Sequence, residues 1–578
     1  MVHPILNPSS TTAPPAPAPP PPQTGWAFRL PPLQVTVQIL LLGAGWAALS
    51  WWVQDITTAP GLWKQYSVLL KDWVFRFLLN WSTATLLLVL LPTRWVAVLL
   101  VIDLVADGAI LSFYAVFRRS LSWLTIAHQT GEGAAVFGVA LRLAAPYLAV
   151  IIPASLVVVW LHRRWSSHWG KGGAVAPVAG LVWLGVFLGL CLDHKPLDRI
   201  KTFETADGIA HSYGFLLTWA AESYYIDHAA LADAALALVN QPAERLCAAV
   251  PLAQLGEKIA VIQVESLDDA LLGFEVKGRK VVPRLTAMRD HGTYLRIQAP
   301  KRNGSCDSDF TMLFGGWPSR QAVPYRISGF PFERSIVQGV NDAGLLSSSY
   351  HGVNGNFFER RAAYQTMGFS RIVFREEMIA SEKLSDPEWA LPDSVVFDVA
   401  TKSRKGAERF FEFVITATSH TPFRFSLAGH KRALFGDSLD VNESYFDTLN
   451  YVDQAIGHYV DGLPQDTLVI IYGDHWSGVN NAALGYKSQV IDEFGVVPAL
   501  LFWKRDGTYA PLFAVDQRLA KSAELRLVDV ARWFRRSLDT GFGDSTSSVE
   551  RRRLASDPHT LTNFPTTPSH APGRGTAL

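Results

Sequence analysis

KIAVIQV, residues Lys258 to Val264, is a short run with one charge at its start and almost only apolar side chains after it. Such a run predicts a strand that is buried on both faces of a sheet. Three further runs have the same character, and helix-like segments separate them. Buried strands that alternate with helices predict an α/β domain with a largely parallel sheet. The three runs are FFEFVITAT (Phe410–Thr418), TLVIIY (Thr467–Tyr472) and VVPALLFW (Val496–Trp503).

Polar residues follow these strands where each one ends. Glu265 follows the first strand, Ser419 and His420 follow the second, and Asp474 and His475 follow the third. In a parallel sheet, ligands gather beyond the carboxyl ends of the strands. A histidine after a strand is often only a loop cap, and Gly-Asp-His is often a turn. Acids and histidines at three strand ends together predict a site for Mn²⁺ or Zn²⁺.

A polar loop offers two candidate nucleophiles for this site. The stretch RNGSCDSDFTMLFGGWPS, Arg302 to Ser319, places Ser305 and Cys306 directly after Gly304. A hydroxyl or a thiol beside a divalent cation can act as a nucleophile. The stretch taken alone is equally compatible with a polar loop that has no catalytic role.

Length and composition exclude several classes of protein. A chain of 578 residues is too long for one hydrophobic core, so several domains are expected. The 52 Lys and Arg nearly cancel the 51 Asp and Glu, so nothing indicates a nucleic-acid partner. Three cysteines without a CxxC pair argue against a cysteine zinc site or a disulfide framework. The mean hydropathy of +0.14 is high for a soluble enzyme.

Apolar stretches of about 20 residues, the length that crosses a bilayer, occur five times in the first third of the chain. Their clustering predicts membrane spans and not buried helices of a soluble protein. The first stretch begins too late for a signal peptide and lacks a cleavage site, which predicts a retained anchor. Five spans put the two chain ends on opposite sides of the membrane. The stretches are Leu33–Val53, Val74–Leu91, Trp95–Phe117, Leu143–Leu161 and Val175–Leu192.

Two acids interrupt the third stretch. Asp103 and Asp107 are one helical turn apart and therefore share a face. An acid inside a membrane marks a transport pathway or a polar partner. The alternative is pairing with Arg142 or hydrogen bonding inside the bundle. The role of the two acids stays open.

Several segments together resemble a known family. They are VIQVES, GSCDSDF, YHGVNGNFFERRAAYQTMGF, TSHTPF, YVDQAIGHYV and YGDHWSG, in that order. The chain resembles the alkaline-phosphatase/sulfatase superfamily and, within it, the lipoteichoic acid synthase and phosphoglycerol transferase group. This resemblance implies an α-helical five-span membrane domain followed by an α/β sulfatase-like catalytic domain. The expected parts are a disordered Pro-rich tail (1–30), the five-helix transmembrane domain (31–193), a helical connector near the membrane (194–256), the catalytic domain (257–542) and a disordered tail (543–578).

The resemblance assigns roles to the residues at the strand ends. Glu265, Asp474 and His475 match the family's metal ligands, and the nucleophile's hydroxyl completes the ligand set. Ser305 stands where the family has a threonine nucleophile. His420 matches the histidine that contacts the phosphoryl group or the leaving group. One divalent ion is implied, Mn²⁺ first and Zn²⁺ as the alternative.

The resemblance also implies a donor pocket. Arg360 stands where the family has an arginine that binds glycerol phosphate, and Phe358 stands where it has a tryptophan. His351 opens the same segment and is expected to line the pocket. Cys306 revives the sulfatase alternative, in which a cysteine matures to formylglycine. The Cys-x-Pro-x-Arg signal is missing, because DSDF follows the cysteine, and this favours Ser305 as the nucleophile.

The implied activity is transfer of glycerol phosphate from phosphatidylglycerol to an extracytoplasmic glycan or polymer, through a phosphoglyceryl-serine intermediate. The implied location is the cytoplasmic (inner) membrane, with several spans and a periplasmic or extracellular catalytic domain. Arg360 is expected to repel the ammonium of phosphatidylethanolamine. The alternatives are a phosphoethanolamine transferase, a sulfatase-like hydrolase of the cell envelope, and a sensor or polymer-binding protein on a catalytically retired fold.

Overall fold

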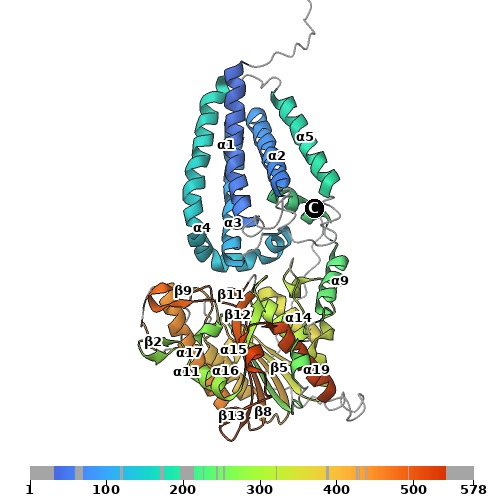
Figure 1. Cartoon of the computed structure of the whole chain (residues 1–578), viewed down its shortest axis with the longest axis vertical. Helices are drawn as coiled ribbons and strands as arrows, with labels where there is room; N and C mark the ends of the chain where they lie inside the picture. Colours follow the sequence, from blue (N-terminus) through green and yellow to red (C-terminus); the bar gives the residue numbers. More distant parts are fainter. Residues whose placement is uncertain are drawn as a thin grey trace, which may run out of the picture.

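The computed structural model places a bundle of long helices above an α/β domain (Figure 1). The predicted tails at both ends lie outside the residues that the structure describes. These residues are 32–58, 69–117, 121–168, 175–194, 214–225, 227–242, 245–250, 254–319, 322–385, 389–424, 427, 430–436, 438, 440–491 and 494–541.

Five long helices coincide with the five apolar stretches. Within the described residues, three segments are long and apolar enough to cross a membrane: Leu33–Ser50, Thr93–Tyr114 and Ala144–Trp165. The apolar parts of the other two helices are shorter. The structure therefore supports a membrane-embedded part, while a count of five spans stays a prediction. The helices are α1 (Leu33–Thr58), α2 (Leu69–Leu90), α3 (Thr93–Phe117), α4 (Trp123–Trp165) and α5 (Val175–His194).

Asp103 finds its partners inside this bundle. Its Oδ2 accepts hydrogen bonds from Trp46 Nε1 at 3.0 Å and from Ser50 Oγ at 2.7 Å, both on α1. Asp107 is buried one turn further along α3. The contacts of Asp103 fit the expectation of hydrogen bonding inside the bundle, and they tie α3 to α1. The side chain of Arg142 is outside the described part of the structure.

Short helices connect the bundle to the α/β domain. They are α8 (Phe215–Tyr225), α9 (His228–Val239) and α10 (Arg245–Ala249). The backbone N–H of Trp123 donates to Glu222 Oε2 at 2.6 Å, which joins α4 to α8. On the other side, Arg532 Nη2 donates to the carbonyl oxygen of Val239 at 2.8 Å, which joins α9 to the α/β domain.

The main sheet has the strand order β14-β4-β12-β8-β1-β7-β5-β6. The strands β8, β1, β7, β5 and β6 run parallel, as predicted. The strand predicted at Val496–Trp503 lies in β12 and runs antiparallel to both β8 and β4, so the sheet is mixed. A buried apolar run does not reveal its direction, because direction depends on the path of the connecting chain. The bounds are β1 (Lys258–Val264), β4 (Thr293–Pro300), β5 (Leu346–His351), β6 (Arg371–Val373), β7 (Phe410–Ile415), β8 (Thr467–Gly473), β12 (Phe494–Arg505) and β14 (Leu525–Arg526).

Helices cover both faces of the sheet. Along β1, Ile259 and Val261 join one hydrophobic core, whereas Ala260 and Ile262 join the other. This alternation is what a strand buried on both faces requires. One face carries α12 (Cys306–Phe314), α13 (Ile336–Asp342), α14 (Arg360–Met367) and α19 (Leu527–Gly541), and the other carries α11 (Pro283–His291), α15 (Arg375–Glu382), α16 (Asp393–Ser403) and α17 (Val441–Asp461). Smaller elements are β2 (Glu275–Val276), β3 (Arg279–Lys280), β9 (Asn480–Asn481), β10 (Tyr486–Lys487), β11 (Val490–Ile491), β13 (Thr508–Pro511) and α18 (Gln517–Lys521).

The carboxyl ends of the parallel strands point toward the helix bundle. Strand β12 pairs with β11 at its start and with β13 at its end. In Figure 1, β11 lies on the side of the α/β domain that faces the bundle, and β13 lies on the far side. Because β8 runs antiparallel to β12, β8 and its parallel neighbours end on the bundle side. The sheet edge that was predicted to carry the site therefore faces the helices.

Candidate metal centre and nucleophile

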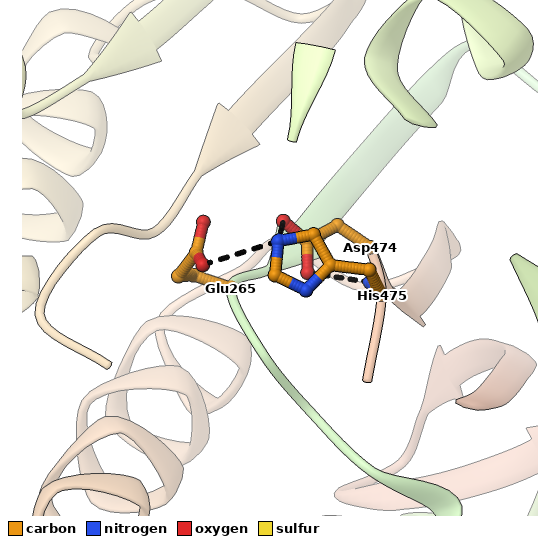
Figure 2. Close-up of side chains that lie close together, drawn as sticks. All are labelled: Glu265, Asp474 and His475. Atoms are coloured by element: carbon orange, nitrogen blue, oxygen red, sulfur yellow. Dashed lines mark hydrogen bonds and ion pairs between the residues drawn. The ribbon is translucent and has the colours of Figure 1, made fainter. Parts of the chain in front are cut away.

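Glu265, Asp474 and His475 form one buried cluster (Figure 2). Glu265 follows β1 and Asp474 follows β8, and these strands are parallel neighbours that pair as far as Val264 and Gly473. Ligand atoms of the three side chains lie within 4.8 Å of one another. His475 Nε2 is 3.5 Å from Glu265 Oε1 and 3.6 Å from Asp474 Oδ2. The register of two strands thus brings together residues that are more than 200 positions apart.

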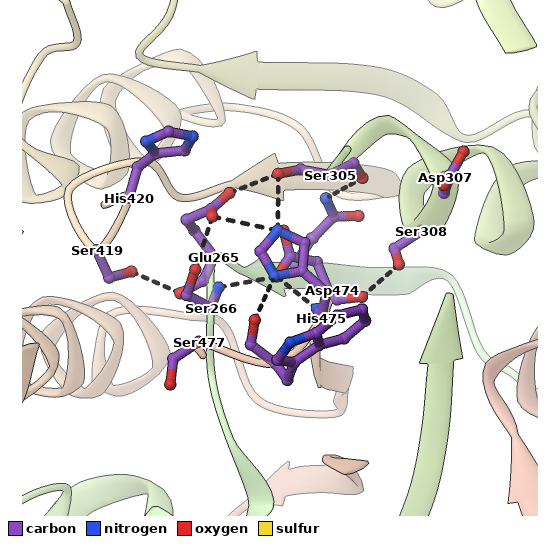
Figure 3. A network of polar contacts seen from close by, with 12 residues as sticks. Glu265, Ser266, Ser305, Asp307, Ser308, Ser419, His420, Asp474, His475 and Ser477 are labelled. Atoms are coloured by element: carbon purple, nitrogen blue, oxygen red, sulfur yellow. Dashed lines mark hydrogen bonds and ion pairs between the residues drawn. The ribbon is translucent and has the colours of Figure 1, made fainter. Parts of the chain in front are cut away.

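Ser305 lies beside this cluster (Figure 3). Its hydroxyl donates to Glu265 Oε2 at 2.7 Å and is 3.3 Å from His475 Nε2. Ser305 occupies the N-cap position of α12, directly after Gly304, whose φ of 120° favours glycine. Asp307 fixes the loop by accepting from the backbone N–H of Asn303 at 2.7 Å. The loop and the helix start together hold the hydroxyl against the cluster.

Asp474 shows that the cluster is suited to a cation. Its Oδ1 accepts from the backbone N–H groups of Ser266 (2.8 Å) and His475 (2.6 Å). Its Oδ2 is buried and has no hydrogen-bond partner in the described part of the chain. Burial, and next to it the charge of Glu265, raises the pKa of Asp474 well above its usual value. A bound cation would stabilise the ionised form of such a buried carboxylate, because it offsets both the burial and the repulsion from the second carboxylate.

The other two candidate ligands have the protonation states that metal binding needs. Burial opposes ionisation of Glu265, but His475, His420 and the hydrogen bond from Ser305 outweigh it and lower the pKa to about 2. Burial lowers the pKa of His475 to about 3, so its ring is neutral near pH 7. Two carboxylates, one neutral imidazole and one hydroxyl fit a divalent ion such as Mn²⁺ or Zn²⁺.

Two buried acids that sequence reasoning missed shape the loops around the cluster. Asp268 accepts from the backbone N–H of Ser477 at 2.9 Å and from the hydroxyl of Tyr486 at 2.8 Å, which anchors the loop after Asp474. Asp393 accepts from the backbone N–H of Ala417 at 2.8 Å and steadies the loop that leads to His420. Burial raises the pKa of Asp393 to about 7. Only partners that are distant in sequence distinguish these acids from surface acids, so the sequence carries no signal for them.

His420 follows β7 and is half-buried at the same sheet edge. Its Nδ1 lies 2.7 Å from the carbonyl oxygen of Thr421 and therefore carries a proton. The ring stacks at a tilt on Trp389, with 5.2 Å between the centroids. The preceding residue, Ser419, donates to the carbonyl oxygen of Glu265 at 2.7 Å. These contacts place His420 beside the loop that carries Glu265.

The predicted donor-pocket residues lie together next to the nucleophile loop. Arg360 is 1% exposed, and its guanidinium carbon lies 5.2 Å from the ring centre of Phe358. A Cβ atom at Gly304 would lie 2.7 Å from Cζ of Phe358, so this ring packs directly on the residue before Ser305. His351 Nε2 is 3.5 Å from Arg360 Nη1. Sequence reasoning missed Asp309, whose carboxylate pairs with Arg360 at 2.8 Å.

The side chain of Cys306 lies away from the metal-ligand cluster, in the hydrophobic core. It is fully buried on the α12 face of the sheet. Burial and the neighbouring Asp307 raise the pKa of the thiol well above its usual value. The thiol therefore stays protonated, which suits a packing residue and not a nucleophile.

Comparisons with known proteins agree with the motifs. Residues 258–525 match the family described as Sulfatase. The lipoteichoic acid synthase-like protein YvgJ of Bacillus subtilis (strain 168) is 23% identical over 236 residues, which are 39% of this chain and 38% of that protein. The lipoteichoic acid synthase of Staphylococcus aureus (strain USA300) is 25% identical over 234 residues, 38% of this chain and 36% of that protein. The match thus spans less than two fifths of either relative.

Among solved structures, the integral membrane protein lipooligosaccharide phosphoethanolamine transferase A (EptA) from Neisseria meningitidis aligns with 82% of this chain. The alignment covers 89% of that protein, with 13% identity and a TM-score of 0.43. The family match and the curated relatives confirm the predicted resemblance to the lipoteichoic acid synthase group.

Proposed function

Because residues 258–525 match the sulfatase family and the curated relatives are lipoteichoic acid synthases, we propose that this protein is a membrane-anchored phosphoglycerol transferase. The observation that carries the proposal is the hydroxyl of Ser305, which donates to Glu265 inside the cluster with Asp474 and His475. This arrangement supplies a held nucleophile beside a candidate metal centre.

The proposed reaction has two displacement steps. Ser305 Oγ attacks the phosphorus of phosphatidylglycerol, a P–O bond to the serine forms, and the P–O bond to diacylglycerol breaks. The serine proton passes to Glu265, and the departing oxygen takes a proton from Nε2 of a protonated His420, which we propose as the general acid. An acceptor hydroxyl on a glycan or polymer then attacks the same phosphorus and gives its proton to His420. The P–O bond to Ser305 breaks, and the serine oxygen takes its proton back from Glu265.

The chain's own residues prepare the nucleophile. Glu265 Oε2 fixes the orientation of Ser305 Oγ through the hydrogen bond of 2.7 Å, and it is the nearest acceptor for the serine proton. A divalent ion bound by Glu265, Asp474, His475 and Ser305 would favour the serine alkoxide and offset phosphate charge. We propose Mn²⁺ for this ion, with Zn²⁺ as the alternative.

The position of the site suits a lipid donor. The sheet edge at which β1 and β8 end faces the helix bundle (Figure 1), and Ser305 bonds to Glu265 just after β1. A lipid headgroup in the same membrane would therefore lie on the side of the nucleophile. We further propose that all five helices span the cytoplasmic membrane and that the catalytic domain, residues 257–542, lies outside the cytoplasm. This orientation gives the enzyme access to an extracytoplasmic glycan or polymer acceptor.

One observation favours a second candidate, a phosphoethanolamine transferase. Asp309 pairs with Arg360, and both side chains are buried. The pair is neutral overall, so Arg360 repels a substrate ammonium less than the sequence suggested. The choice between the two donor headgroups therefore needs a direct test.

The test uses the purified full-length chain reconstituted in vesicles that contain headgroup-labelled phosphatidylglycerol or phosphatidylethanolamine. We expect diacylglycerol to be released mainly from phosphatidylglycerol and the label to move to an acceptor. Preference for phosphatidylethanolamine would support the second candidate. Label recovered as free glycerol phosphate would identify a hydrolase, and metal binding without lipid turnover would identify a binding protein.

Changing Arg360 to lysine should lower kcat/KM for phosphatidylglycerol about 10-fold, or about 1.4 kcal/mol in the transition state. Lysine keeps the charge but loses the fork that binds Asp309 through Nε and Nη2. The rate of diacylglycerol release measures the effect. Arg404→Lys is the control, because Arg404 forms a buried pair with Glu412 away from the site. Equal losses in both variants would assign the effect to stability.

A further inference from the structure

The carboxylate of Asp309 links the nucleophile helix to the predicted headgroup-binding arginine. We propose that Asp309 is a positioning residue that sets the orientation of Arg360 relative to Ser305, and that Tyr364 in turn fixes Asp309. This inference rests on the proposed function, in which Arg360 contacts the donor headgroup. It assigns a role in donor recognition to two residues that do not themselves contact the donor.

Asp309 lies one helical turn after Ser305. Residues four apart on a helix lie on the same face, so the carboxylate and the nucleophile share one side of α12. Arg360 comes from the start of α14, which is remote in sequence. The pair therefore ties the element that carries the arginine to the element that carries the nucleophile. Loss of this pair is therefore expected to release the arginine from its fixed position relative to the attacking oxygen.

The carboxylate receives three hydrogen bonds. Arg360 Nε donates to Oδ2 at 2.8 Å and Nη2 donates to Oδ1 at 3.4 Å, the two-pronged geometry of a guanidinium fork. The hydroxyl of Tyr364 donates to Oδ2 at 2.6 Å. Asp309 and Tyr364 are fully buried. The carboxylate thus cannot turn without leaving a buried donor unpaired.

The pair determines which N–H groups of Arg360 remain for a ligand. His351 Nδ1 lies 3.0 Å from the carbonyl oxygen of Ile415 and therefore carries the proton, so Nε2 is an acceptor and faces Arg360 Nη1. Burial, with Arg360 second, lowers the pKa of His351 to about 3 and keeps the ring neutral. Of five guanidinium N–H groups, three have acceptors, and two have none in the described part of the chain. Asp309 therefore decides where these two donors point.

The ring of Phe358 packs against the flat face of the Arg360 guanidinium and limits its rotation. The ring lies over Arg360 and also contacts the backbone at Gly304. With one edge on Asp309 and one face on Phe358, the guanidinium has a single orientation. Because the pair is neutral, it offers directed N–H donors and little excess charge, which suits a phosphate or hydroxyl oxygen of the donor headgroup.

The chain contains a matched control away from the site. Glu412, on β7, accepts hydrogen bonds from Arg404 and from the hydroxyl of Tyr459. Arg404 and Glu412 are 6% and 2% exposed, close to the burial of Arg360 and Asp309. Tyr459 and the ring of Phe410 under Arg404 belong to the core on the opposite face of the sheet from α12. An arginine, a carboxylate and a tyrosine thus form a second buried cluster, and its hydrogen bonds within the described residues reach none of the proposed site residues.

The experiment compares Asp309→Asn and Tyr364→Phe with Glu412→Gln and Tyr459→Phe in the reconstituted full-length chain. Thermal stability, metal content, kcat and donor KM are measured for each, with whichever of the two lipids the wild type prefers. We expect Asp309→Asn to lower kcat/KM roughly 30-fold or more and Tyr364→Phe roughly 3- to 10-fold. Both control variants should keep kcat/KM within about 2-fold at a similar loss of stability. Asp309→Glu, which retains the carboxylate, should recover most of the activity.

A second readout tests the link to Arg360. In the Arg360→Lys background, Asp309→Asn should have a much smaller further effect, because the two side chains act as one unit. Unchanged kcat/KM in Asp309→Asn would overturn the inference. So would an equal loss in Glu412→Gln. If Asp309→Asn does not fold, Tyr364→Phe against Tyr459→Phe decides the question by itself.

The same experiment separates the inference from the proposed function. Wild-type turnover of phosphatidylglycerol tests the function, and the variant comparison tests Asp309. A wild type that prefers phosphatidylethanolamine overturns the donor assignment, yet the Asp309 comparison still supports or contradicts the positioning role. A wild type that consumes neither lipid overturns both proposals.

Discussion

Ser305→Ala should abolish transfer, with a loss of about 10⁴-fold or more, because it removes the hydroxyl that lies against both Glu265 Oε2, at 2.7 Å, and His475 Nε2, at 3.3 Å. The fold should survive, since the side chain is half-buried and its removal leaves only a small gap. Metal binding should weaken but persist through Glu265, Asp474 and His475. Diacylglycerol release and metal content measure the two effects. Mass spectrometry of the wild type, but not of the variant, should detect the phosphoglyceryl adduct on the peptide that contains residue 305.

Cys306→Ala is the matched control, because it changes the next residue along the same helix start. The buried thiol contacts the hydrophobic core, so its loss should cost about 1 kcal/mol of stability and leave most of the activity. The opposite outcome, an inactive Cys306→Ala and an active Ser305→Ala, would contradict the serine mechanism. It would revive the formylglycine chemistry of sulfatases.

Removing the metal should also abolish turnover, and adding a divalent ion back should restore it. The reason is the electrostatics of the cluster. Among the described residues, Asp474 Oδ2 is buried without a hydrogen-bond partner, and the ionised Glu265 is close by. Bound metal should stabilise the fold by mass action, about 2.7 kcal/mol at a free concentration of 100 times Kd. Elemental analysis and melting curves before and after chelation check this, and reconstitution with Mn²⁺ or Zn²⁺ identifies the functional ion.

Asp474→Asn is the corresponding substitution. The amide oxygen can still accept from the backbone N–H groups of Ser266 and His475, so the loop should stay in place while the charge is lost. We expect metal content well below one ion per chain and a loss of activity of about 10³-fold. Asp453→Asn is the control, because Asp453 is a buried acid that accepts from the backbone of Leu285 at 2.7 Å at the start of α11. A fully metallated, active Asp474→Asn would contradict the proposed metal centre.

Features that depend on local sequence could be predicted. The four apolar runs are strands, and the apolar stretches of the first third are helices, because burial on both faces or exposure to lipid selects apolar side chains at every position. Glu265 and Asp474 could be placed at one edge because each follows the end of its strand. Strand direction could not be predicted in this way, since β12 is an apolar run like the parallel strands β1, β7 and β8 but runs antiparallel to β8.

The tertiary structure decided the contacts between side chains that are distant along the chain. Asp309 is paired with Arg360, 51 positions away, and Asp268 receives the hydroxyl of Tyr486 from 218 positions away. Nothing in the local sequence distinguishes these acids from solvated ones, because a buried charge is defined by the partners that fold around it. The sequence by itself determined which chemical groups stand at the strand ends. Only the folded chain shows that the carboxylate of Asp309, on the helix whose N-cap is Ser305, pairs with Arg360 and accepts the hydroxyl of Tyr364.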